Sequence, residues 1–169
     1  MKIIIILGID PGIAIVGWGV VEYKGNKFKP LGFGSVQTPA SMKTEDRLVE
    51  IFNSINEIIK KYKPDCMAVE ELFWNTNQTT GIRVSEARGV ILLCAARLGI
   101  PVYEYTPLQV KQAVVGYGKA EKHQVIAMVT SILKLKKAPK PDDTADAIAI
   151  AICHAQSSAS AMGKYFNQR

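Results

Sequence analysis

Carboxylates recur in this sequence at the ends of apolar segments. Asp10 follows the run IIIILGI, Glu70 closes CMAVE, and Asp143 and Asp146 open the apolar stretch DDTADAIAIAICHA. Each acid alone has an ordinary explanation as a turn residue, a strand end or a helix cap. Acids that come from distant segments and each mark the end of a buried element are nevertheless typical of a cation site.

Such a group of acids suits phosphodiester hydrolysis. Carboxylates packed together repel one another, and without cations some of them must bind protons. Hard oxygen ligands select Mg²⁺ or Mn²⁺, and two such ions can activate a water and stabilise the leaving oxygen. His123 and His154 lack a partner at metal-ligand spacing, which argues against zinc. No serine, cysteine or lysine has a base beside it in sequence, so covalent catalysis finds no positive support.

The last acidic segment offers two pairs of acids with helical spacing. Asp143 and Asp146 are three residues apart, and Asp142 and Asp146 are four apart. Residues at either spacing share one face of a helix. The spacing therefore leaves open whether Asp142 or Asp143 accompanies Asp146.

The basic residues favour a polyanionic partner, nucleic acid first. The net charge is +6 and the pI is near 9.2. A solvated basic loop is the better interpretation of LKLKKAPK. Lys111 and Lys122 are more informative, because each opens a predicted helix near the acidic edge and could hold a phosphate there. Phe73 and Trp74 stand in the polar loop FWNTNQTTG, where they could stack on an unpaired base or divide between core and surface.

The hydrophobic pattern predicts the elements that position these residues. Residues 3–9 form a strand buried on both faces, and two strands joined by short turns follow it in an antiparallel meander. Helical periodicity then alternates with the strands CMAVE and PVYEY, which indicates parallel pairing. The prediction is an α/β fold with a five-stranded mixed sheet, three antiparallel and then two parallel strands, flanked by helices. The predicted helices cover residues 43–63, 79–98, a segment opened by Thr106-Pro107, 121–133 and 143–155.

At 169 residues the chain predicts one domain over 1–158 and a flexible C-terminal tail over 159–169. Its three cysteines are widely spaced within apolar segments, as buried thiols of a reducing compartment would be. The N-terminal apolar run is too short to span a membrane and lacks a cleavage site. These features predict a cytoplasmic protein.

The chain resembles the RuvC-type Holliday junction resolvases, bacterial crossover-junction endonucleases with an RNase H-like fold. The likeness runs from about Ile4 to Ala155. The motifs that carry it are GIDPG, AVEELF, SEARGV, PVYEYTPLQVKQAVVG, GKAEKHQV and DDTADAIAIAICHA. The resemblance implies nicking of four-way DNA junctions during recombination and repair.

The resemblance also assigns roles to individual residues. It implies that two Mg²⁺ ions, replaceable by Mn²⁺, bind to Asp10, Glu70, Asp143 and Asp146. Some relatives carry histidine at the position of Asp143. Phe73 would stack at the junction, Lys111 and Lys122 would contact the DNA backbone, and Trp74 stands where relatives carry aromatics.

The family's partners follow from the same resemblance. It implies a homodimer, whose two-fold symmetry suits a four-way junction, and cooperation with a RuvA–RuvB branch-migration complex. Ala87, Gly89 and Cys94 form a face of small residues on the helix at 79–98, which either packs in the core or forms the dimer surface. The alternatives to a resolvase are an ATPase of the actin and sugar-kinase type, a non-enzymatic junction-binding protein, and a ribonuclease H-like enzyme that cuts RNA–DNA hybrids.

Overall fold

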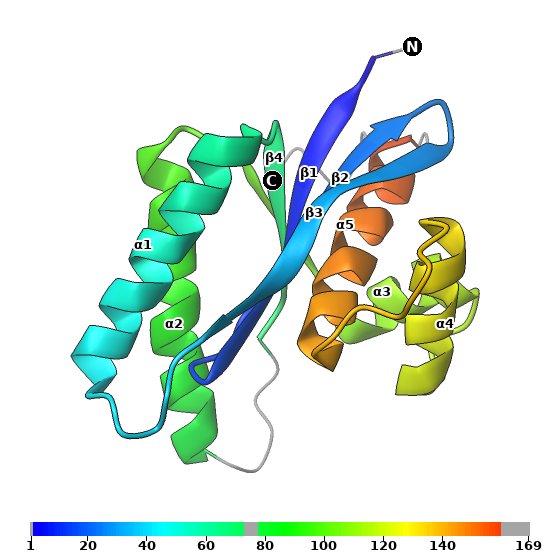
Figure 1. Ribbon diagram of the computed structural model, residues 1–169. Coiled ribbons are helices and arrows are strands. Elements are labelled where there is room, and N and C mark those ends of the chain that lie inside the picture. The colour runs from blue at the N-terminus through cyan, green and yellow to red at the C-terminus, as the bar shows by residue number, and fades with distance from the viewer. Residues whose placement is uncertain (1, 73–77, 160–169) are drawn as a thin grey trace.

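A single mixed sheet forms the centre of the molecule (Figure 1). The computed structural model describes residues 2–72 and 78–159, and in this part of the chain the strand order is β3-β2-β1-β4-β5. The first three strands are antiparallel, whereas β4 runs parallel to β1 and β5 parallel to β4. The predicted five-stranded mixed sheet is therefore confirmed. The strands are β1 (Ile4–Asp10), β2 (Ile15–Lys24), β3 (Lys27–Gln37), β4 (Cys66–Glu70) and β5 (Val102–Tyr105).

Helices cover both faces of the sheet, α1 and α2 on one side and α3, α4 and α5 on the other (Figure 1). Each side has its own buried apolar cluster. All the predicted helices form, with ends that differ by a few residues from the prediction. They are α1 (Thr44–Tyr62), α2 (Gln78–Arg97), α3 (Pro107–Val115), α4 (Lys122–Ile132) and α5 (Asp142–Ala159).

The small-residue face on α2 was predicted either to pack in the core or to form a dimer surface, and its three residues differ in this respect. Ala87 and Cys94 are fully buried in the cluster that α1 and α2 form with the sheet, so core packing accounts for both. Gly89 is exposed, and a side chain at this position would meet no atom within 4 Å. Of the three residues, only Gly89 remains available for contact with another chain.

Helix α5 lies unusually close to the sheet because glycines line the strands beneath it. A Cβ atom on Gly8 of β1 would lie 2.0 Å from the carbonyl oxygen of Ala147, and one on Gly17 of β2 would lie 1.9 Å from that of Asp143. Neither position can hold a side chain without moving the helix. The hydroxyl of Thr144 donates a 3.1 Å hydrogen bond to the carbonyl of Gly34 in β3, which fastens the first turn of α5 to the same surface.

Because α3 and α4 pack on its other side, α5 is enclosed almost completely. Residues 144, 145 and 147–155 are all buried. The described residues contain no helix that is long and apolar enough to cross a membrane. The predicted tail begins at the last residue of α5, Ala159, and its remainder, 160–169, lies outside the described residues.

We predict that Gly17→Ala destabilises the protein strongly, because the new methyl group must displace the backbone of α5. Overpacking against a rigid neighbour costs at least about 2 kcal/mol, which lowers the melting temperature by roughly 4–8 °C. Gly34→Ala is the matched control, since its methyl group would meet the edge of the Trp18 ring at 3.2 Å. Thermal unfolding followed by circular dichroism tests this ranking, and equal losses in the two variants would contradict it.

Candidate active site

Two of the predicted acids stand side by side where neighbouring parallel strands end. Ile9 of β1 pairs with Val69 of β4, and the next residues along the two strands are Asp10 and Glu70. The carboxyl ends of parallel strands are the usual position of ligand sites in open α/β sheets. The crossover through α1 makes the two strands adjacent.

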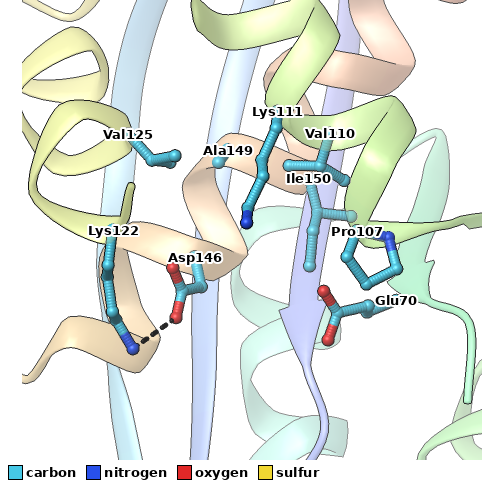
Figure 2. A pocket seen from close by; sticks show the side chains of 9 residues that line it. All are labelled: Glu70, Pro107, Val110, Lys111, Lys122, Val125, Asp146, Ala149 and Ile150. Carbon is cyan, nitrogen blue, oxygen red and sulfur yellow. Dashed lines mark ion pairs between the residues drawn. The ribbon is translucent and has the colours of Figure 1, made fainter. Parts of the chain in front are cut away.

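The first turns of α5 bring the other acids to this edge. Asp10 pairs with Gly17 across the β1–β2 ladder, and the carbonyl of Asp143 lies directly above Gly17. Asp146 follows one turn later and lines a pocket of about 220 Å³ together with Glu70. Figure 2 shows both carboxylates facing this pocket from opposite sides, with the side chain of Lys111 directed between them.

The acids disfavour one another's ionisation. Burial raises the pKa of Asp10 to about 8, and the charges of Glu70, Asp146 and Asp143 contribute to the rise. Burial also raises the pKa of Glu70, with the charge of Asp146 adding to the effect. The pKa of Asp146 is raised by burial in spite of a nearby lysine. Asp10, Glu70 and Asp146 therefore share one electrostatic environment, as their order in the sequence predicts.

The structure distinguishes Asp143 from Asp142. Asp143 is half-buried, and its charge is one of those that raise the pKa of Asp10. Asp142 is exposed, and its charge acts instead on Asp146 and on Lys122. Of the two pairs that helical spacing allows, the pair of Asp143 and Asp146 is the one that faces Asp10.

Lys122 and Lys111 both line the pocket (Figure 2). The ammonium nitrogen of Lys122 lies 3.1 Å from a carboxylate oxygen of Asp146. Burial lowers the pKa of Lys122, but the hydrogen bond to Asp146 and the neighbouring carboxylates outweigh this and raise it. The charges of Lys122 and Lys111 oppose the rise in the pKa of Glu70.

The prediction that Lys111 opens a helix is wrong. Lys122 does open α4, but Lys111 lies in the middle of α3, which begins at Pro107. Thr106 caps this helix through reciprocal bonds with Gln109, at 3.2 and 2.8 Å. The cap fixes where α3 starts, and the side chain of Lys111 reaches the pocket from one turn further along.

The donor set fits a hard divalent cation in its chemistry. All four acids offer oxygen ligands, which suit a hard cation. Burial, together with the charges of neighbouring acids, raises the pKa of Asp10, Glu70 and Asp146, and a bound cation would favour their ionised forms. Within residues 2–72 and 78–159, no three His, Cys, Asp or Glu side chains lie in an arrangement that would already hold a metal ion. The ion pair of Lys122 with Asp146 engages one of the carboxylates that a cation would need.

Sequence analysis did not single out every residue at this site. The apolar wall of the pocket consists of residues that no local pattern marks as part of a site: Pro107, Val110, Val125, Ala149 and Ile150. Arg88 of α2 donates to the carbonyl of Glu70 from Nε at 3.3 Å. In the sequence, the one feature that could have drawn attention to Arg88 is its position between the small residues Ala87 and Gly89. The predicted stacking residues, Phe73 and Trp74, lie outside the described residues.

The sequence matches a known protein family along most of its length. The family model described as crossover junction endodeoxyribonuclease RuvC matches residues 6–154. The RuvC proteins of Alkaliphilus metalliredigens and Clostridioides difficile are 60% and 61% identical over 153 residues, which cover 90% of this chain and 93% and 90% of those proteins.

Solved structures show the same fold. Thermus thermophilus RuvC in complex with a Holliday junction substrate superposes with a TM-score of 0.86 at 41% identity, over 90% of this chain and 93% of that one. The yeast mitochondrial Holliday junction resolvase Ydc2 shares the fold with a TM-score of 0.61 at 14% identity, over 89% of this chain and 78% of that one.

The mixed sheet with acids at the ends of β1 and β4 and at the start of α5 defines the class of RNase H-like proteins. Within that class, this chain belongs to the RuvC family of crossover junction endodeoxyribonucleases.

We predict that Asp10→Asn stabilises the metal-free protein, and more so at pH 8 than at pH 5. Folding raises the pKa of Asp10 from 3.8 to about 8, so the folded state binds a proton that the unfolded state releases between these values. Stability from this group is therefore present at low pH and is lost as the pH rises through that window. Asparagine carries no charge at either pH.

Thermal unfolding in EDTA at the two pH values measures the effect. The gain in melting temperature from Asp10→Asn should be larger by at least about 3 °C at pH 8. Asp142→Asn is the control, because that side chain is exposed. A gain from Asp10→Asn that does not change with pH would contradict the raised pKa.

Proposed function

We propose that this protein is a Mg²⁺-dependent endonuclease that resolves four-way DNA junctions by paired nicks during recombination and repair. The observation that carries the proposal is the convergence of Asp10, Glu70 and Asp146, which disfavour one another's ionisation beside two lysines. Family membership supports the junction as substrate, since the T. thermophilus relative has been solved with one.

In this proposal Asp10, Glu70, Asp143 and Asp146 hold the cations. Two Mg²⁺ ions, or Mn²⁺ in their place, would supply the activation of a water and the stabilisation of the leaving oxygen. The acids would position the ions at the strand ends. The low-dielectric surroundings that raise the pKa of Asp10 also strengthen its attraction to a divalent ion.

Lys111 and Lys122 are proposed to bind the DNA backbone. Both reach the pocket from helices that cover the same face of the sheet. Lys122 is paired with Asp146. When the Asp146 carboxylate binds a cation instead, the ammonium group of Lys122 would become available to a phosphate. Phe73 is proposed to stack at the junction, with Trp74 beside it, on the family resemblance alone.

Cleavage of a synthetic mobile junction, with and without Mg²⁺, tests the proposal directly. We predict paired, symmetric nicks that require the cation. Asp146→Asn should reduce the rate at least about a hundred-fold while junction binding survives, because a cation ligand is lost but the lysines remain. Asp142→Asn is the matched control, one turn earlier on α5, and should cut at nearly the wild-type rate.

A ribonuclease H-like activity is the nearest alternative, since the same acids would serve it. An RNA–DNA hybrid incubated under identical conditions separates the two functions. Faster cutting of the hybrid than of the junction would reject the resolvase, and undiminished cutting by Asp146→Asn would reject the proposed site.

We further propose that α2 contributes to a dimer surface. Ile82 and Leu93 are exposed at 53% and 51%, and Glu86 and Gly89 lie between them on the same helical face. Exposed apolar residues along one helix suit a second copy of the chain, and the missing side chain of Gly89 permits close approach. An isologous pair would present two sites to the opposed strands of a junction.

We predict that Leu93→Glu shifts the protein towards monomers, because it replaces an exposed apolar side chain of this helical face by a charged one. Sedimentation velocity measures the change. Met128→Glu is the control, since Met128 is 38% exposed on α4, on the other side of the sheet. A dimer that survives Leu93→Glu would exclude this face of α2.

The remaining partners follow from the family alone. We propose that the protein acts with a RuvA–RuvB branch-migration complex and does so in the cytoplasm, where bacterial DNA lies. The three free, buried cysteines are consistent with a reducing compartment.

A further inference from the structure

Arg88 of α2 is a largely buried charge beside the proposed site. Its side chain is 12% exposed, and Nη2 lies 2.9 Å from a carboxylate oxygen of Glu104 on β5. The two groups are close but are not aligned for a hydrogen bond. The buried Nη2 therefore has no hydrogen-bond partner among the described residues. Burying a guanidinium with an incomplete set of bonds costs free energy, and such pairs are weak sources of stability.

The second contact of Arg88 lies at the end of β4. The ladder between β1 and β4 ends at Ile9 and Val69, one residue before Glu70. At this point Nε of Arg88 donates to the carbonyl of Glu70 at 3.3 Å. On the other side, the backbone N–H of Glu71 donates to the carbonyl of Tyr105 at 2.8 Å. The peptide unit between Glu70 and Glu71 is thus held on both sides.

Arg88 therefore connects three elements at one place. It projects from α2, binds the backbone of β4, and pairs with a residue of β5 that stands opposite Val69 in the ladder. Its charge is not one of those that lower the pKa of Glu70, in contrast to those of Lys122 and Lys111. The arginine acts on the backbone of Glu70 and leaves the carboxylate free for the pocket.

We propose that Arg88 is a positioning residue for Glu70: its bond to the carbonyl, oriented by Glu104, fixes the end of β4 so that the Glu70 carboxylate meets a bound cation in the correct place. This inference rests on the proposed function of Glu70 as a cation ligand. Partners that orient a metal ligand typically contribute about ten- to a hundred-fold in metal affinity.

The test replaces Arg88 by methionine, which keeps the apolar stem and removes every donor. We expect the Mg²⁺ concentration for half-maximal junction cutting to rise at least about ten-fold, with the rate recovering towards wild type at high Mg²⁺. A second readout needs no activity: the Mg²⁺ concentration that half-maximally raises the melting temperature of the DNA-free protein should shift by the same factor. Junction binding in EDTA should be unchanged.

Two further variants separate positioning from folding. Arg88→Lys keeps the positive charge beside Glu104 but lacks the Nε donor, so it should shift the Mg²⁺ midpoint as methionine does. Glu104→Gln keeps the arginine and should produce a smaller shift in the same direction. Arg97→Met is the matched control, because Arg97 lies at the far end of α2 over the ring of Phe52 and should leave the midpoint unchanged.

The outcomes distinguish this inference from the proposed function. Unchanged Mg²⁺ midpoints in Arg88→Met and Arg88→Lys would overturn the positioning role, even if both variants melt at lower temperature. The absence of any effect of Mg²⁺ on the wild-type melting temperature would overturn it as well. A wild-type protein that fails to cut junctions, yet shows a stabilisation by Mg²⁺ that depends on Arg88, would reject the resolvase and retain the positioning role.

Discussion

The close packing of α5 on the sheet is the constraint on which the site depends. Gly8, Gly17 and Gly19 place no side chains beneath the first turns of the helix, so the backbone of α5 lies directly on β1 and β2 there. A helix at an ordinary distance from a sheet would hold its first turn several ångströms further from Asp10. Because the glycines remove that layer, the acids of α5 meet those of the strand ends.

This proximity has an electrostatic cost that the fold tolerates. Burial and mutual repulsion raise the pKa values of Asp10, Glu70 and Asp146, which makes the ionised site unfavourable without cations. Lys122 relieves part of the repulsion through its ion pair with Asp146. The repulsion between the acids destabilises the fold, and the two buried apolar clusters on either side of the sheet stabilise it.

The backbone around the acids is fixed by side chains that carry no chemistry themselves. Thr144 ties the first turn of α5 to β3, and Arg88 holds the end of β4. Near the loop that follows Asp10, Thr38 donates to the carbonyl of Ile13 at 2.5 Å and accepts a bond from Arg47 at 2.7 Å. Each acid therefore stands next to a segment whose position is set by at least one specific contact.

The sequence by itself determined the elements and the identity of the acids. Periods of two and of three to four residues fix which segments are strands and which are helices, and these patterns are local. The order of Asp10, Glu70 and Asp146 at the ends of these elements was sufficient to predict their convergence, because a right-handed crossover makes β1 and β4 neighbours. The start of α3 at Thr106-Pro107 was likewise evident from consecutive residues.

Only the tertiary structure decided between alternatives that share one local pattern. Helical spacing admits both Asp142 and Asp143, and in the folded protein it is the charge of Asp143 that is among those raising the pKa of Asp10. The small residues Ala87 and Gly89 look alike in sequence, yet one is buried and the other exposed. The bond of Arg88 to Glu70 joins residues 18 apart. Such contacts depend on the distances between packed elements, which no pattern within a single segment encodes.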